Sequence, residues 1–463
     1  MQNTYKLYLF IFFLATAIPF SSCKKYLDKK PSNGIATPES IDDLQALLDD
    51  ATLVMNQNAT PSFGETSADD YFVLPAYYKT TAVNNQHFYI WQPYEYNYPN
   101  DWSRSYTVIY NANYCLDMLG KQEVSDKNKA RWNNVYGSAK FYRAYYYLQL
   151  AFVYTKAYDA ATSKTDEGIV LRESSDFNIP SKRANVEDTY KQIVEDTREA
   201  INYLPDLPVH VFRPSKAAAY GLLARTFLSM RIYDSAYRYA NLCLQLKNDL
   251  MDFNADADVL AFTTTYPIKK FNKETIFYTE MYTGFNSYPM VLTTRSKIDS
   301  LLYQSFDAND LRKKAWFLLS DGYYRFRGTY SQTSIPFTGL ATDEMYLIRA
   351  ECMARKGDDA LSGAINDLNI LLQKRFVKAA FVPYASTSKT DVLNKILDER
   401  RKELLFRAIR WSDIKRLNKE GRNIMLQREV GGKIYSLQAN SNYYALPLPY
   451  DIVTLTGIKQ NTY

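Results

Sequence analysis

Residues 215–246 constrain the fold more than any other stretch, because they predict two helices that pack closely against each other. Small side chains recur there at Ala224, Ala236, Ala240 and Cys243, and Phe227 lies between them. Small residues let two antiparallel helices approach, and a large apolar residue fills the remaining space. One such pair cannot bury its own apolar face, so several pairs have to stack.

A second stretch with this organisation lies at residues 343–375. Ala350, Met353, Gly357 and Ala364 take the corresponding positions, with a turn about two residues longer than in a standard tetratricopeptide unit. Residues 129–154 and 186–204 predict a third, more degenerate pair. We therefore expect a mainly α fold, a tetratricopeptide-like scaffold of helix pairs, with helical repeats near 129–246 and 343–417.

Two long insertions, near 56–102 and 250–340, lack helical periodicity and are rich in aromatic residues. We expect irregular structure there, with short strands at 275–280 and 323–326. The chain has 41 Tyr and 5 Trp but only 2 His. Rings with a polar edge suit ligands that have apolar faces and hydroxyl groups, such as sugars. The rings either hold such a ligand or fill a core beneath the loops, and the candidates are Trp91, Tyr94, Tyr96, Tyr98, Trp102, Tyr282, Tyr288 and Trp316.

The N-terminus has the pattern of an export signal. Lys6 precedes an apolar run over residues 7–20, which is too short for a comfortable membrane span. Small residues then precede Cys23, as in a lipobox, so we expect a signal peptide at 1–22 and lipid attachment at Cys23. An ordinary signal peptide with a chance Cys is the alternative. Residues 23–40 predict a polar tether to the membrane, and residues 41–463 predict a single domain.

Composition argues against several kinds of chemistry. The formal net charge is +6 without a dense basic run, so we expect no nucleic-acid partner. His87 and His210 lack neighbours at metal-ligand spacing, and we expect no metal, no cofactor and no catalytic residue. The three other Cys are expected in helix cores rather than in disulfides, and they are Cys115, Cys243 and Cys352.

A glycoside hydrolase needs only two carboxylates, which sequence spacing alone cannot exclude. We interpret the available acids as turn, cap and loop residues, and they are Asp69, Asp70, Asp252, Asp256 and Asp258.

The segment 399–416 is dense in charge and predicts a structural helix. On one helix, Glu403 reaches Arg400 and Arg407, and Asp413 reaches Arg410 and Arg416. Because Arg surrounds these carboxylates, they are expected to stay ionised, unlike a general acid. The predicted ion-pair residues are Glu399, Arg400, Glu403, Arg410, Asp413 and Arg416.

Five stretches together resemble the SusD/RagB family of outer-membrane nutrient-binding lipoproteins. They are YLDKKP (26–31) after the Cys, KFYRAYYYLQLAFVY (140–154), EMYLIRAECMARKGD (344–358), ERRKELLFRAIRWSDIKR (399–416) and the ending NYYALPLPYDI…GIKQN (442–461). One departure is Arg407 and Ala408, where the family often has Glu-Gly.

The resemblance implies a lipid-anchored protein on the outer-membrane surface of a Bacteroidota-type bacterium. It implies that such a protein binds oligosaccharides, or peptides in the RagB type, and delivers them to a SusC-like TonB-dependent transporter. Two other functions stay open. A surface glycoside hydrolase would release products, and a tetratricopeptide adaptor would bind only other proteins.

Overall fold

The helix pair expected at 215–246 is present in the computed structural model, which describes residues 37–284 and 295–463. It consists of α10 (Lys216–Ser229) and α11 (Tyr233–Leu246). Ser215 caps α10 by accepting a hydrogen bond from the Ala218 amide. Ala224, Ala236, Ala240 and Cys243 are all fully buried, and the Cys243 thiol of α11 lies 3.2 Å from the Ala217 carbonyl of α10. The predicted helix pair is confirmed, and its predicted small residues are buried.

The second pair is α15 (Thr342–Lys356) and α16 (Leu361–Arg375), joined by the short 3₁₀ turn η2 (Asp358–Ala360). Gly357 ends α15 with a φ of +142°, a backbone conformation that disfavours any side chain. Ala350 and Ala364 are fully buried, as the tetratricopeptide pattern predicts.

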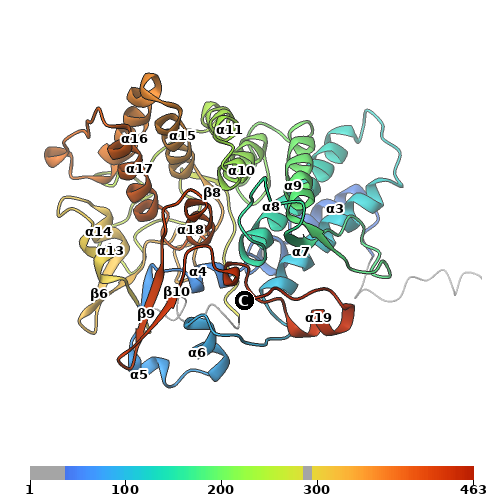
Figure 1. The fold of residues 1–463 in the computed structure, drawn as a ribbon. Helices are drawn as coiled ribbons and strands as arrows, with labels where there is room; N and C mark the ends of the chain where they lie inside the picture. The colour runs from blue at the N-terminus through green and yellow to red at the C-terminus, as the bar shows by residue number, and fades with distance from the viewer. Residues whose placement is uncertain (1–36, 285–294) are drawn as a thin grey trace, which may run out of the picture. The chain divides into compact units, whose positions relative to one another are not determined.

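The third pair is α8 (Lys129–Tyr154) and α9 (Val186–Ile201), and α7 (Asp101–Leu119) packs against α8. The buried guanidinium of Arg143 on α8 binds both carboxylate oxygens of Asp196 on α9 at 2.7 Å. In Figure 1, α9, α10, α11, α15 and α16 follow one another from right to left across the upper part of the ribbon. The fold is therefore mainly helical and built from stacked pairs.

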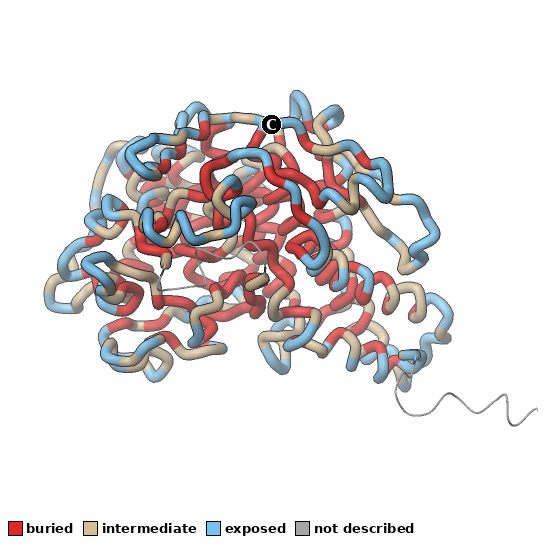
Figure 2. Tube along the Cα trace, turned by 90° about the horizontal axis from the view of Figure 1, so that it is seen from below, coloured by how far each residue is buried: buried red, intermediate tan, exposed pale blue. Residues whose placement is uncertain are grey.

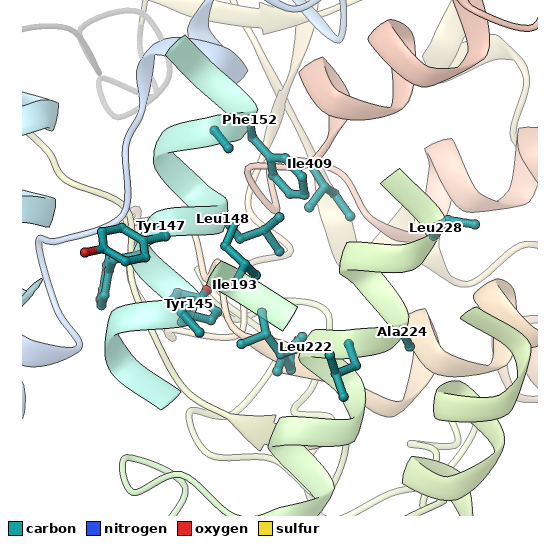
Figure 3. Packing of buried hydrophobic residues seen from close by; sticks show 14 of the residues in the cluster. Tyr145, Tyr147, Leu148, Phe152, Ile193, Leu222, Ala224, Leu228 and Ile409 are labelled. Atoms are coloured by element: carbon teal, nitrogen blue, oxygen red, sulfur yellow. The ribbon is translucent and has the colours of Figure 1, made fainter. Parts of the chain in front are cut away.

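The core lies between these helices. From Gly137 to Tyr154 nearly every side chain of α8 is buried, which is typical of a helix covered on all sides. Figure 3 shows Tyr145, Leu148 and Phe152 of α8 among side chains of α9, of α10 and of the segment at Ile409. In Figure 2 the buried stretches run through the interior, and the exposed ones follow the peripheral loops. The three free cysteines are buried as expected.

The two aromatic insertions meet each other. Strand β1 (Tyr71–Val73) of the first pairs antiparallel with β5 (Ser296–Ile298) of the second. The second insertion also holds β4 (Thr275–Phe277), paired with β8 (Leu340–Ala341), and the hairpin β6 (Phe317–Ser320) to β7 (Tyr323–Phe326). The short strands expected at both places are present. The π-helical turn η1 (Ala51–Met55) precedes the first insertion. The insertions further contain these helices: α4 (Phe63–Ser67), α5 (Pro75–Tyr78), α6 (Val83–Tyr89), α13 (Ser300–Gln304) and α14 (Arg312–Trp316).

The expectation of one helix over 399–416 is wrong. Helix α17 (Lys389–Glu403) ends there, and α18 (Arg410–Asn418) starts after a break. Phe406 and Ala408 have φ of +56° and +61°, which no α-helix contains. Because of this break, Phe406 packs in the smaller hydrophobic cluster against Phe326, with 4.9 Å between the ring centroids. Trp411 packs in the main core.

The remaining elements flank this scaffold. They are α3 (Ile41–Leu48), β2 (Glu167–Val170), β3 (Arg183–Asn185), η3 (Lys378–Ala380), β9 (Leu426–Val430), β10 (Lys433–Leu437), η4 (Asn442–Tyr444) and α19 (Tyr450–Thr456). Among the described residues, no helix has the length and apolar content needed to cross a membrane. The expected signal peptide, Cys23 and most of the tether lie outside the described residues.

Candidate functional site

Most of the rings expected to hold a ligand are core residues, and for these the prediction is wrong. Trp91, Tyr94 and Tyr96 are each at most 6% exposed. The indole of Trp91 donates to the Ser67 carbonyl at 3.0 Å, and the Tyr96 hydroxyl donates to the Pro447 carbonyl at 2.8 Å. These hydrogen bonds satisfy the polar edges of Trp91 and Tyr96, whereas the Tyr94 hydroxyl is buried without a hydrogen-bond partner among the described residues. All three rings pack in the core beneath the first insertion.

Trp316 is also a core residue. A Cβ at Gly328 would lie 2.0 Å from its ring, so the glycine is what lets the chain pass over it. Tyr282 is nearly buried, and the guanidinium of Arg104 lies 5.2 Å from its ring centroid. Tyr98 is exposed beside α19, where its amide donates to Asp451. Tyr288 lies outside the described residues.

Trp102 is as buried as these core rings, at 4% exposed, but it also lines a hollow. This aromatic groove has a volume of about 380 Å³ and lies between α7, the segment 170–181 and α19. Its volume falls in the range of about 300–1,000 Å³ that is typical of small-molecule sites. Its lining residues are Trp102, Ser103, Tyr106, Thr107, Ile109, Tyr110, Asn113, Val170, Arg172, Ser174, Ser175, Phe177, Ser181, Ile452 and Thr456.

Helix α7 places three rings along one face of the groove. Trp102, Tyr106 and Tyr110 are four residues apart, which brings them onto neighbouring turns of a helix. The Trp102 and Tyr106 ring centroids lie 4.7 Å apart, and the Tyr106 hydroxyl donates to the Val170 carbonyl at 2.6 Å. The adjacent face of α7, with Val108 and its neighbours, enters the core. The groove floor is therefore fixed to the scaffold.

Asp101 secures the start of this helix. Its buried carboxylate accepts hydrogen bonds from the Ser62 and Phe63 amides at 2.6 and 2.8 Å. Burial raises the pKa of Asp101 to about 7, although these hydrogen bonds oppose the shift. Asn100 precedes it as the N-cap and accepts from the Ser103 amide.

The opposite wall of the groove is a loop held by polar side chains of α7. Asp117 accepts hydrogen bonds from the Ser175 amide at 2.8 Å and from its hydroxyl at 2.7 Å. Asn113 donates to the Arg172 carbonyl at 2.6 Å. The Arg172 guanidinium donates to the carbonyls of Asp176 and Ile179, which closes the loop on itself. An irregular segment thus becomes a fixed wall.

Two rings of the groove remain available to a ligand. Tyr110 is 44% exposed and Phe177 is 81% exposed. Single exposed apolar residues are common, but two exposed rings beside one hollow make it a candidate binding surface. Hydroxyls flank them at Thr107 and Thr456, and each donates to a helix carbonyl, which leaves its oxygen free to accept. Apolar faces with hydroxyl neighbours suit a ring that presents both C–H faces and hydroxyl groups.

Sequence reasoning missed Tyr106, Tyr110 and Phe177. For the first two the signal was present, because they continue the four-residue spacing from Trp102 beside the core face of α7. Phe177 stands in a polar segment without periodicity, and only the folded loop places it opposite the helix.

The charged residues around 399–416 form buried ion pairs, but with different partners from those expected. Glu403 binds Arg312 and Arg375, not Arg400 or Arg407. Arg410 binds Asp69 rather than Asp413. Arg416 binds Asp413 at 2.7 Å, as expected, whereas Arg400 binds Asp413 at 2.8 Å in place of Glu403.

Glu399 of the same segment pairs with Arg312 at 2.5 Å. Burial alone raises the pKa of Glu399, but Arg312 and two lysines lower it to about 2. Its carboxylate is therefore ionised and fixed in an ion pair, which suits a structural role.

The acids weighed for hydrolysis are engaged as well. Asp69 and Asp70 are held by Arg410 and Arg401. Asp252 and Asp256 pair with lysines at 3.1 and 2.8 Å.

The three carboxylates that lie close enough together to suggest a metal site are also paired. Glu274, Asp343 and Glu403 are buried within 4.8 Å of one another. Arg375 binds Glu274 and Glu403, and Arg407 binds Asp343. These two guanidiniums offset most of the charge of the three carboxylates, and burial raises the pKa of Glu274 to about 7, so the geometry fits an ion-pair cluster.

Comparison with known proteins gives two family matches. Residues 25–228 match the family described as "Starch-binding associating with outer membrane", and residues 323–462 match the SusD family. A relative is SusD-like protein P2 of Formosa agariphila, 26% identical over 75% of this chain and 76% of that protein.

Solved structures with the same fold include a SusD superfamily protein of Bacteroides thetaiotaomicron. It has a TM-score of 0.76 and 20% identity, over 92% of this chain and 100% of that one. A putative sugar binding protein of Bacteroides vulgatus has a TM-score of 0.74 and 19% identity, over 92% and 99%. A SusD-like carbohydrate binding protein of the same species has a TM-score of 0.66 and 19% identity, over 90% and 97%.

Proposed function

The chain belongs to the SusD/RagB family, and we propose that it captures an oligosaccharide in the aromatic groove without cleaving it. The observation that carries this proposal is the pair of exposed rings, Tyr110 and Phe177, at the mouth of a hollow floored by Trp102. A sugar ring has two C–H faces, which pack on aromatic rings, and equatorial hydroxyls, which take polar partners.

The groove is also preorganised. Its helical wall belongs to the scaffold, and its loop wall is held by Asp117, Asn113 and Arg172. Binding therefore orders few groups, and little affinity is lost to immobilising side chains. This suits a protein that captures scarce nutrients.

Attachment at the cell surface and delivery to a transporter complete the proposed function. Family membership favours lipid attachment at Cys23, an outer-membrane location and a SusC-like TonB-dependent partner. Acylation would be seen as a mass increase on the mature N-terminal peptide beginning at Cys23, and it would disappear in Cys23→Ser. Co-purification of the full chain with a much larger barrel protein tests the partner.

The ligand is identified by screening the purified protein on a glycan array and measuring each hit by calorimetry. The proposal expects binding of at least one oligosaccharide, with the oligosaccharide recovered unchanged by chromatography after long incubation. Released products would support a surface hydrolase instead. Binding of peptides and no glycans would favour a RagB-type peptide carrier.

A further inference from the structure

A second, polar hollow lies where α8 and α18 both end. This polar cleft has a volume of about 130 Å³, and its wall includes Lys156, Asp166, Lys415, Lys419, Asn442 and Tyr444. An adjoining hollow of about 150 Å³ shares Lys156, Asp166 and Asn442 with it. The cleft has none of its lining residues in common with the aromatic groove.

The distinctive group of the polar cleft is the ammonium of Lys415, which is buried without an opposite charge. The side chain is 5% exposed, and its Nζ donates to the Phe152 and Thr155 carbonyls at 2.8 and 2.6 Å. Within residues 37–284 and 295–463, no carboxylate lies within ion-pair distance of it. Burial lowers the pKa of Lys415 to about 7.

The two carbonyls explain why Lys415 lies at this place, because a cation at the end of a helix satisfies its last acceptors. They do not balance its charge. The other cations of the wall are already neutralised, since Lys156 pairs with Asp166 at 3.2 Å and Lys419 pairs with Asp159 at 3.1 Å. No carboxylate of the wall therefore offsets the positive charge that Lys415 carries below about pH 7.

Tyr444 is a second buried polar residue of the cleft whose polar group is not fully satisfied by the protein. It is 3% exposed, with its ring centroid 4.6 Å from that of Trp411. Its hydroxyl is buried beside the Asn418 side chain, but no pair of atoms in the described part of the chain gives it a hydrogen bond of good geometry. A buried hydroxyl without a partner costs free energy, so such groups usually meet a water or a ligand.

We propose that the polar cleft binds an oxyanion, a carboxylate or a sulfate, between the ammonium of Lys415 and the hydroxyl of Tyr444. Both groups donate to anionic oxygens, and Asn442 at the rim offers a further amide donor. An oxyanion would arrive either free in solution or as the acidic group of a sugar. The site is independent of the aromatic groove and of the function proposed for it.

The test compares sodium sulfate and sodium glucuronate with sodium chloride at equal ionic strength, at pH 6. Calorimetry and the melting temperature of the purified protein report binding. We expect sulfate, glucuronate or both to bind and to raise the melting temperature more than chloride does. Preference for sulfate indicates a free or ester-borne sulfate, and preference for glucuronate indicates a sugar carboxylate.

Two variants assign that binding to the cleft. Lys415→Met removes the charge and should weaken binding about tenfold or more. Tyr444→Phe removes a hydroxyl that makes no hydrogen bond of good geometry in the described structure, so it should fold as the parent does and bind several-fold more weakly. The control Lys433→Met, at an exposed lysine of β10, should bind as the parent does. Binding no better than chloride, or unchanged binding in both cleft variants, overturns the proposal.

Discussion

Arg312 of α14 donates to Glu403 of α17 at 2.8 Å, with both side chains fully buried. The same guanidinium also binds Asp310 and Glu399, so one cation from the second insertion meets three carboxylates. This contact joins the insertion to the helical repeat that follows it. It also explains why the charges of α17 serve the fold rather than a reaction.

Replacing Arg312 should therefore be costly. Arg312→Met leaves three buried carboxylates without their shared partner, and we expect a loss of about 3–5 kcal/mol in the free energy of unfolding. Urea denaturation monitored by circular dichroism measures it. The matched control is Arg131→Met, whose ion pair with Asp42 is largely exposed and should be worth less than about 1 kcal/mol. Equal effects of the two variants would contradict the account.

The buried ring at position 96 should affect stability and not binding. Tyr96→Phe removes the hydrogen bond to the Pro447 carbonyl and leaves that buried acceptor unpaired, at a cost of about 1 kcal/mol. Tyr98→Phe, at an exposed neighbour, should leave stability unchanged. Thermal unfolding distinguishes them. If Tyr96→Phe unfolds like the parent but loses glycan affinity, Tyr96 contacts the ligand and its assignment to the core fails.

The raised pKa of Asp101 predicts the direction in which the stability of the protein changes with pH. Its folded pKa, about 7, lies above the ordinary value, so the folded protein binds a proton more tightly than the unfolded chain does. This contribution stabilises the protein below about pH 4 and is lost as pH rises through about 7.

The Asp101→Asn variant lacks that titration. Relative to the parent it should gain stability between pH 4 and pH 7, at up to about 1.4 kcal/mol per pH unit. Urea denaturation of both proteins across this range measures the difference. A relative loss of stability with rising pH would show that the carboxylate is ionised by its amide partners instead.

The sequence predicted the scaffold well because its signals are local. Small residues such as Ala224 and Cys243 meet across one helix pair, and their spacing is visible without any tertiary information. The break between α17 and α18 was not visible, since Phe406 and Ala408 adopt positive φ without a glycine. Tertiary packing of Phe406 overrides the helical pattern there.

The site was harder to predict for a different reason. Aromatic content indicates rings near a surface, but it does not say which rings face solvent. Trp91 and Tyr96 turn inward to carbonyls from distant segments, whereas Tyr110 faces a loop that its own helix fastens. Those partners are far apart in the chain, so spacing alone could not separate core rings from groove rings.

The most direct measurement is the affinity for the identified glycan of the variants Tyr110→Ala and Phe177→Ala. Both rings are exposed, so the fold should persist, and each loss should weaken binding about tenfold, equivalent to about 1.4 kcal/mol. Tyr237→Ala is the matched control, because that tyrosine is 38% exposed on α11, away from the groove. Weaker binding in both groove variants with an unchanged control is the predicted result. Unchanged affinity in two folded groove variants would contradict the assignment of the aromatic groove as the glycan site.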